Sequence, residues 1–373
     1  MNIATRIDPS AQPVAAAMRD IGEAGREAAQ VLATASPETK NTALQAMARD
    51  LRDASNELIS ANAMDLGAAR TANKPAAFID RLALDADRIE AMAKSLEDIA
   101  GLDDPVGEVI ASWDRPNGLQ IERVRQPIGV IGIIYESRPN VTSDAAGLCL
   151  KSGNAAILRG GSDSIHSAQA IEACLHAGLG EAGLPKSAIQ VVPTVDREAV
   201  GLMLAGLGGN IDLIVPRGGR SLVERVQTDA RVPVFAHLEG VCHVYVDKSA
   251  DLAMAKAIIV NAKMRRTGIC GAAETLLVDE ADADRLLAPL VTALLKAGCE
   301  VRGDKATQAV SEKVVAAVDE DWPNEFLDTI ISVRTVHGVD GALDHIQTHG
   351  SEHTEAIVAE DSSAVEKFLN GCN

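Results

Sequence analysis

One cysteine of this chain has neighbours that suit a catalytic nucleophile. Cys270 lies between two nearby glycines in the stretch NAKMRRTGICGAAE, shortly after the cations Lys263, Arg265 and Arg266. Positive charge lowers the pKa of a thiol, and the thiolate is the form that attacks an acyl carbon. The glycines keep bulk away from the sulfur. We therefore predict that Cys270 is a covalent catalyst.

The other five cysteines lack this combination of neighbours. Cys149 and Cys174 lie in apolar helical stretches, Cys242 and Cys299 lie in or beside expected strands, and Cys372 is near the last residue. Buried structural thiols are the common fate of such cysteines. The sequence has no C-x-x-C pair and no zinc-ligand spacing. We expect free thiols, no metal and a reducing, cytoplasmic location.

Two expected strand-to-helix turns combine arginine, Gly-Gly and serine, at Arg159–Ser162 and Arg217–Ser221. Gly-Gly lets backbone N–H groups approach an anion, serine is a favoured N-cap, and a helix N-terminus favours phosphate. Neither turn is G-x-G-x-x-G, so the ordinary dinucleotide fingerprint is absent. A tight turn without a ligand explains either occurrence equally well, and both interpretations remain open.

Further polar residues follow expected strands at their carboxyl ends, where open α/β sheets bind ligands. Pro139 excludes a continuing strand, so Ser137, Arg138 and Asn140 are expected in a loop. An arginine such as Arg159 at a strand tip suits the 2′-phosphate of NADP, although a surface salt bridge is the commoner role of an arginine. His237 is interpreted as a structural histidine.

A strand–helix alternation is expected to position these residues. It predicts a parallel α/β sheet with right-handed crossovers. The expected strands of a first series are 128–134, 155–158, 189–192 and 211–215, with a helix at 164–177. A second series has expected strands at 232–238, 243–247, 274–279 and 354–360, with helices at 251–264 and 282–297 and a short terminal helix.

The segment before these series is expected to be helical from residue 11 to about 100, and Ser36-Pro37 is a predicted helix start. Residues 107–127 alternate like strands and predict a projecting hairpin that pairs with another subunit. We place a cofactor-binding domain at 1–237 and a catalytic domain at 238–373.

Composition narrows the classes of partner. The 373 residues carry a formal net charge of -18 and only 2% aromatics, which disfavours nucleic acid and anionic membranes. The segment Met1–Ala17 has no signal-peptide pattern, and no apolar run is long enough to span a membrane. An anionic small substrate would need a local cluster of cations.

The stretches 124–162, 211–222, 235–247 and 261–279 together resemble the aldehyde dehydrogenase superfamily, and within it the gamma-glutamyl phosphate reductase branch. The resemblance implies a Rossmann-type cofactor domain and an α/β catalytic domain. It implies a thioester on Cys270 formed from gamma-glutamyl phosphate, reduction by NADPH, and release of glutamate 5-semialdehyde for proline biosynthesis. Arg159, Gly160 and Ser162 would contact the adenine ribose of NADPH, and Gly218 and Gly219 its pyrophosphate.

The resemblance also suggests the remaining roles. The Cys270 N–H with Ser137 or Asn140 would form the oxyanion hole, and the substrate's two anionic groups would bind Arg138, Lys263 or Arg266. His237 occupies the place of the glutamate base of hydrolytic aldehyde dehydrogenases, which fits a reductase whose exchange partner is phosphate. The implied partners are a second copy of the chain, as a homo-oligomer, and glutamate 5-kinase.

Some features depart from the branch, and alternatives stay open. The cysteine segment has Thr267 and Gly271 where relatives usually have proline and asparagine, and relatives continue beyond Asn373 through a stretch that completes the fold. A hydrolytic aldehyde dehydrogenase that uses Glu239 as its base is one alternative. A non-catalytic protein that keeps the cofactor fold is another.

Overall fold

The computed structural model describes residues 12–372, and the chain divides after Ala236 into two compact units. We call them the N-terminal unit and the C-terminal unit. The domain boundary expected from the sequence lies one residue later. The segment Met1–Ala17 lies largely outside the described residues. Among the described residues, no helix has the length and apolar character needed to cross a membrane.

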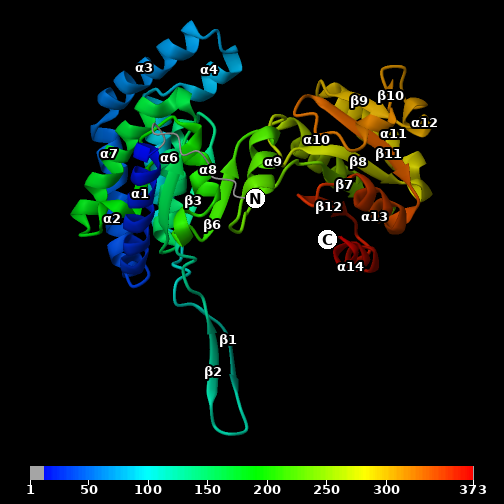
Figure 1. The fold of residues 1–373 in the computed structure, drawn as a ribbon. Helices are drawn as coiled ribbons and strands as arrows, with labels where there is room; N and C mark the ends of the chain where they lie inside the picture. Colours follow the sequence, from blue (N-terminus) through cyan, green and yellow to red (C-terminus); the bar gives the residue numbers. More distant parts are fainter. Residues whose placement is uncertain (1–11, 373) are drawn as a thin grey trace, which may run out of the picture. The chain divides into compact units, whose positions relative to one another are not determined.

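The N-terminal unit contains a four-stranded parallel sheet in the order β5-β4-β3-β6. All four strands were predicted, and helices α1, α6 and α7 pack against them (Figure 1). Because the strands are parallel, their carboxyl ends share one edge. The elements are β3 (Val130–Tyr135), α6 (Pro139–Lys151), β4 (Ala155–Arg159), α7 (Ile165–Glu181), β5 (Ile189–Val191), α8 (Arg197–Leu204), β6 (Leu213–Arg217) and α9 (Arg220–Asp229).

A predicted helical layer precedes this sheet. The Ser36 hydroxyl accepts a hydrogen bond from the Thr39 N–H at 3.2 Å and caps α2, with Pro37 in the first turn. Leu44, Met47 and Leu51 then recur on one helical face and are fully buried. The helices are α1 (Gln12–Leu32), α2 (Pro37–Asp53), α3 (Ser55–Thr71), α4 (Ala76–Leu82) and α5 (Ala86–Ala100).

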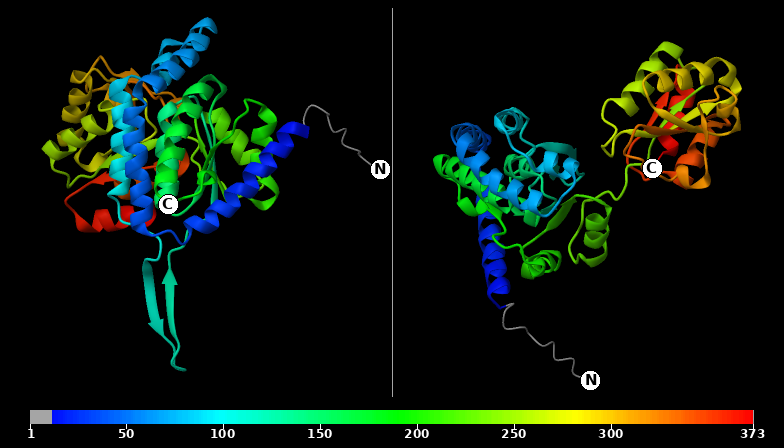
Figure 2. Two further views of the ribbon diagram at one scale, coloured as in Figure 1. Left: turned by 90° about the vertical axis from the view of Figure 1, so that its left-hand side faces the viewer. Right: turned by 90° about the horizontal axis from the view of Figure 1, so that it is seen from above.

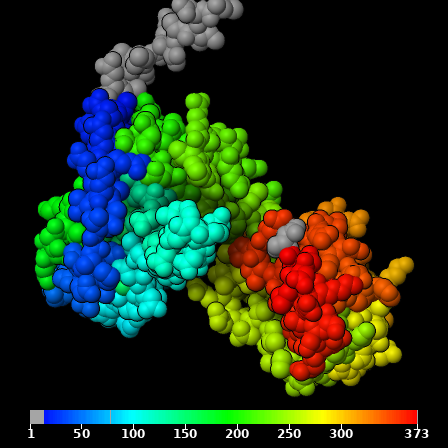
Figure 3. All heavy atoms as spheres, turned by 90° about the horizontal axis from the view of Figure 1, so that it is seen from below, coloured from blue at the N-terminus to red at the C-terminus, as the bar shows by residue number. Residues whose placement is uncertain are grey.

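An antiparallel hairpin of β1 (Val109–Asp114) and β2 (Gln120–Val124) leaves the body of the N-terminal unit (Figures 1 and 2). Every residue of both strands is exposed, and the hairpin is the cyan region seen from its tip in Figure 3. Trp113 and Ile121 are paired, so their side chains share one face. An isolated two-stranded ribbon with an apolar face gains stability by packing against a partner.

The C-terminal unit contains a six-stranded parallel sheet in the order β10-β9-β11-β8-β7-β12. Helices α10 and α11 bury one apolar cluster against it, and α13 and α14 bury another. The elements are β7 (Cys242–Val246), α10 (Leu252–Met264), β8 (Ala273–Asp279), α11 (Ala283–Lys296), β9 (Glu300–Gly303), α12 (Lys305–Gln308), β10 (Val315–Ala316), β11 (Ile330–Val336), α13 (Gly338–His349), β12 (Glu355–Val358) and α14 (Ser362–Gly371).

One predicted strand of the second series is wrong. Residues 232–238 form a single parallel bridge, Val234 to Ile214, beside β6 of the N-terminal unit. Pro233 has no N–H to donate, and the Phe235 side chain is 75% exposed. The segment therefore ends the first sheet and does not begin the second one.

Candidate active site

The predicted turns of the N-terminal unit meet at the carboxyl edge of its sheet. Strand β3 lies between β4 and β6, so the residues that follow the three strands are neighbours. Ser137 follows β3, Gly160 follows β4, and Gly218 follows β6. This is the edge at which open parallel sheets bind ligands.

The Gly160-Gly161 turn packs closely on the end of β3. A Cβ atom on Gly161 would lie 2.3 Å from the Ser137 Oγ, and one on Gly160 would lie 3.1 Å from the Tyr135 ring. These glycines therefore allow the turn after β4 to pack closely against the end of β3. Ser162 is exposed and begins a short 3-10 turn, Ser162–Ser164, so the expectation that it caps the following helix is wrong.

The turn after β6 already binds a carboxylate. The Gly219 N–H, at the start of α9, donates a hydrogen bond to the Glu136 Oε1 at 2.7 Å. Gly219 is the N-cap residue and makes no side-chain cap, which corrects the expected serine cap at Ser221. This helix N-terminus is therefore able to hold an anionic oxygen.

Arginines surround this edge. Partial burial, and then the positive charges of Arg81 and Arg217, lower the pKa of Arg138. Arg159 is only 7% exposed, and its guanidinium donates to the carbonyl oxygens of Gly160 and Val195. Its Nε is buried without a hydrogen-bond partner among the described residues. The edge thus concentrates positive charge in a chain with a formal net charge of -18.

Cys270 lies in the C-terminal unit, at the amino edge of its sheet and not at the carboxyl edge. It belongs to the loop that leads from α10 into β8, at the amino end of the strand. Its side chain is partly exposed. The Cys242 thiol donates to the Cys270 carbonyl oxygen at 3.1 Å, and a Cβ atom on Gly240 would lie 2.0 Å from the same oxygen. The backbone beside the sulfur is therefore held by a contact that only glycine at position 240 permits.

Two histidines accompany the Cys270 sulfur. One ring nitrogen of His237, one of His353 and the Cys270 Sγ all lie within 4.8 Å of one another. The two rings are edge-to-face, with centroids 4.7 Å apart. These residues precede β7, β12 and β8, which are adjacent strands, so the sheet order β8-β7-β12 gathers them at one edge.

Four other cysteines are unsuited to attack. Burial raises the pKa of Cys149 and Cys242 to about 12, and that of Cys174 and Cys299 to about 11. All four are buried, as the sequence predicts for Cys149 and Cys174. They stay protonated near neutral pH, and a thiol is a poor nucleophile.

The predicted substrate cations of the C-terminal unit separate into two kinds. Lys263 is fully buried, and its ammonium lies 2.6 Å from the carboxylate of Glu274, which is also fully buried. The environment of Lys263 therefore does not support its predicted contact with substrate. Arg266 is exposed, as is Arg265.

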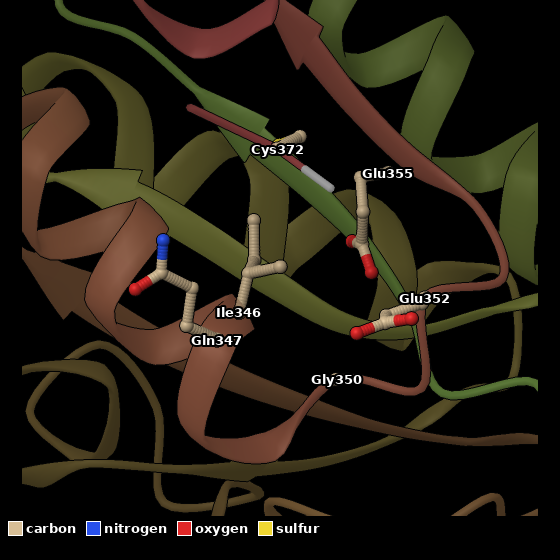
Figure 4. A pocket seen from close by; sticks show the side chains of 6 residues that line it. All are labelled: Ile346, Gln347, Gly350, Glu352, Glu355 and Cys372. Atoms are coloured by element: carbon tan, nitrogen blue, oxygen red, sulfur yellow. The ribbon is translucent and has the colours of Figure 1, made fainter. Parts of the chain in front are cut away.

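The cavity shown in Figure 4 is a different feature of the C-terminal unit. Its volume is about 60 Å³, far below the roughly 300 Å³ at which small-molecule sites begin. One oxygen of Glu355 binds the His243 Nδ1 at 2.9 Å, and the other is buried without a partner among the described residues. The lining omits Cys270 and consists of Ile346, Gln347, Gly350, Glu352, Glu355 and Cys372.

Comparison with known proteins identifies the family of the chain. The model of the aldehyde dehydrogenase family matches residues 7–320. A gamma-glutamyl phosphate reductase of Allorhizobium ampelinum is 63% identical over 96% of this chain and 84% of its own length, and one of Rhodopseudomonas palustris is 60% identical over 97% and 84%. The crystal structure of the reductase from Thermotoga maritima is 44% identical, covers 95% of this chain and 85% of its own, and superposes with a TM-score of 0.90.

The chain belongs to the gamma-glutamyl phosphate reductases of the aldehyde dehydrogenase family. It is an oxidoreductase, and its family works with a nicotinamide cofactor. A more remote likeness, 16% identical with a TM-score of 0.62, is to an acetylating aldehyde dehydrogenase from Geobacillus thermoglucosidasius and concerns the fold alone.

Only some of the residues around Cys270 could be predicted from the sequence of this reductase. His353 was not singled out, because its approach to Cys270 depends on β7 lying between β8 and β12. His237 was interpreted as structural, and it lies beside the sulfur. Ser137 and Arg138 lie between β3 and α6 as predicted, but Asn140 lies in the first turn of α6, so its expected place in a loop is wrong. Ser137 is buried, and the Asn140 amide donates to Asp144 at 3.0 Å.

Proposed function

We propose that this chain reduces gamma-glutamyl phosphate to glutamate 5-semialdehyde and phosphate with NADPH, through a thioester on Cys270, in cytoplasmic proline biosynthesis. The observation that carries the proposal is the placement of Cys270. Its thiol is partly exposed, beside two imidazoles, on a backbone held against Gly240. A nucleophile needs this combination of access and fixed position.

The chemistry at Cys270 is an acyl transfer followed by a reduction. The thiolate attacks the acyl carbon of the substrate, the carbon–oxygen bond to phosphate breaks, and phosphate departs. When NADPH is bound, it supplies a hydride to the thioester carbon. The Cys270 sulfur then leaves as thiolate while the carbonyl re-forms as the aldehyde. The thiolate is regenerated, so the cysteine completes a cycle.

The N-terminal unit carries the proposed cofactor contacts. Its residues fit a dinucleotide phosphate because the Gly219 N–H binds an anionic oxygen and arginines gather at the same edge. We assign the pyrophosphate to Gly218 and Gly219, and the adenine ribose with its 2′-phosphate to Arg159, Gly160 and Ser162. A helix N-terminus and cations together favour phosphate over neutral ligands.

The substrate's charged groups need donors of their own. We assign them to Arg138 and Arg266, and the developing oxyanion to the Cys270 N–H with Asn140 or Ser137. Asn140 is the better of these two, because it is exposed and carries amide donors, whereas the Ser137 hydroxyl is packed beside Gly161. We further propose that the hairpin joins copies of the chain in a homo-oligomer, and that glutamate 5-kinase supplies the labile acyl phosphate in contact with it.

The test is the reverse reaction, followed as reduction of NADP with glutamate 5-semialdehyde and phosphate. We expect a rate that requires phosphate and falls by at least about 10³-fold in Cys270→Ser, because the nucleophile is lost. Cys372→Ser, a half-buried thiol of the same unit, is the control that keeps the rate.

Other outcomes would separate the alternatives. Oxidation without phosphate, abolished by Glu239→Gln, would identify a hydrolytic aldehyde dehydrogenase. A Cys270 that alkylates no faster than free cysteine, in a chain without activity, would indicate a binding protein.

A further inference from the structure

We propose that His237, Cys270 and His353 form a binding site for a zinc ion. All three belong to the C-terminal unit, and each offers one ligand atom within 4.8 Å of the other two. They converge because they precede three adjacent parallel strands, β7, β8 and β12. The site is assembled by the sheet and not by a sequence motif.

The spacing is close to what zinc requires. With Zn–S of about 2.3 Å and Zn–N of about 2.0 Å, two ligands on one tetrahedral ion lie roughly 3.3–3.6 Å apart. No pair of the three atoms therefore has to close by more than about 1.5 Å. His237 is exposed and Cys270 and His353 are partly exposed, so their side chains have room to adjust and an ion has a route from solvent.

The ligand types select the metal. A thiolate with two imidazoles suits zinc, whereas Mg²⁺ and Ca²⁺ prefer oxygen ligands. Three protein ligands leave a fourth position for water, as in catalytic zinc sites. When the Cys270 sulfur binds the ion, the thiol proton passes to the buffer.

Neighbouring groups support one of the histidines. The His353 Nδ1 contacts the Thr354 hydroxyl at 2.8 Å, which leaves Nε2 for the ion. Metal-binding histidines commonly engage their other ring nitrogen in this way, and the contact fixes the orientation of the ring. The Cys242 thiol lies 3.6 Å from the same Nδ1 and donates to the Cys270 carbonyl oxygen at 3.1 Å, so it borders the three residues from the side of β7.

The consequence is inhibition, and this part rests on the proposed function. An ion bound to the Cys270 sulfur occupies the electron pair that must attack the acyl phosphate. Zinc is thus expected to stop the reaction reversibly and to shield the thiol from oxidation and alkylation. A chelator should restore the activity.

Binding is tested first, on the whole chain without cofactor or substrate. Co²⁺ serves as the spectroscopic probe, because a thiolate ligand adds a sulfur-to-metal charge-transfer band, and Zn²⁺ affinity is measured by competition with a chromophoric chelator. We expect one ion per chain. Cys270→Ser should lose the band. His353→Ala and His237→Ala should each lower the zinc affinity by at least about tenfold, because even the loss of a residue that only supports a ligand has an effect of that size.

Two control variants complete the test. Cys372→Ser removes a half-buried thiol of the same unit, and His337→Ala removes a histidine with a 91% exposed side chain; both should bind zinc as the parent does. A band that survives Cys270→Ser, or zinc affinity unchanged in His237→Ala and His353→Ala, would overturn the site. Alkylation of Cys270 checks the folded state of each histidine variant.

Activity assays then distinguish this inference from the proposed function. Reductase activity without zinc binding would reject the site and leave the function standing. Zinc binding through these residues, without any reductase activity in metal-free protein, would support the site and reject the proposed function. Tight binding with no loss of activity would refute the inhibitory role of the ion.

Discussion

The two units use opposite edges of their parallel sheets. In the N-terminal unit the candidate residues follow the strands β3, β4 and β6, at the carboxyl edge. In the C-terminal unit His237, Cys270 and His353 precede the strands β7, β8 and β12, at the amino edge. The first edge has a helix N-terminus and arginines, and the second has a thiol and imidazoles.

This difference follows from the direction of the helices at each edge. Helices begin after the carboxyl ends of parallel strands, so their free N–H groups favour phosphate there. A helix ends before the amino edge, since α10 stops at Met264 ahead of Cys270, and its partial negative charge does not favour a thiolate. We infer that the contact with Gly240 provides the position of Cys270.

Among the variants that compare the two edges, the largest effect is therefore expected at Gly240. In Gly240→Ala the new Cβ would lie 2.0 Å from the Cys270 carbonyl oxygen, so the cysteine loop must move. Displacement of a reacting group by about 1 Å lowers rates about 100-fold. We expect kcat to fall by about this factor while the KM for NADPH changes little, as measured by steady-state kinetics.

Gly268→Ala is the matched control, because its Cβ would come no closer than 3.9 Å to a neighbouring atom. Equal losses in both variants would mean that the loop is sensitive to any added bulk, and the specific role of the Gly240 contact would be refuted.

Arg159→Ala examines the other edge. The guanidinium has buried donors, and hydrogen bonds to a charged group are worth roughly 1.5–3 kcal/mol, which is about 10- to 100-fold in binding. We expect NADPH to lose affinity by such a factor and NADH by much less, in titrations of cofactor fluorescence. An equal loss for both cofactors would show that Arg159 only supports the turn through the Gly160 and Val195 carbonyls.

Strands with regular apolar runs could be predicted from the sequence, and so could the helical layer. The central strand β11 was missed, because its apolar run contains Arg334. In the structure this arginine lies over the Trp322 ring and contacts His345, so its charge is accommodated by long-range neighbours. No local pattern reports such neighbours.

The residues of the candidate sites also divide into those that local sequence neighbours indicate and those that only the fold brings together. Cys270 was singled out by its local glycine and cation neighbours, but the burial of Lys263 against Glu274 could not be predicted from that local pattern. His353 could be found only from the strand order, which brings residues far apart in sequence to one edge. Local spacing thus singled out the proposed nucleophile but not the two histidines beside it.

The third prediction concerns acid stability, which should differ between the units. Burial lowers the pKa of His345, in the C-terminal unit, to about 3. Between pH values of about 3 and 6.5 the unfolded chain holds a proton that the folded unit lacks, so the free energy of unfolding falls as pH falls. The slope is at most about 1.4 kcal/mol per pH unit, or tenfold in the unfolding equilibrium.

His345→Gln should flatten this dependence, followed by urea unfolding of a Trp113→Phe background in which Trp322 reports the C-terminal unit. Trp322 lies 5.5 Å from the His345 ring. His337→Gln is the control, because Glu280 raises the pKa of His337 and gives the opposite sign. An unchanged acid slope in His345→Gln would assign acid sensitivity to other groups.

The smallest effect is expected at Glu136, whose carboxylate occupies the Gly219 N–H where we place the cofactor pyrophosphate. Glu136→Gln removes a negative charge that competes with the ligand and keeps a neutral acceptor for the N–H. A difference of about 1 kcal/mol between charged and neutral acceptors predicts NADPH binding tighter by about fivefold. Glu224→Gln, on the same helix α9, removes one charge without touching the turn. If both variants tighten NADPH binding equally, the gain comes from the change in net charge. Glu136 then does not compete with the cofactor for the Gly219 N–H.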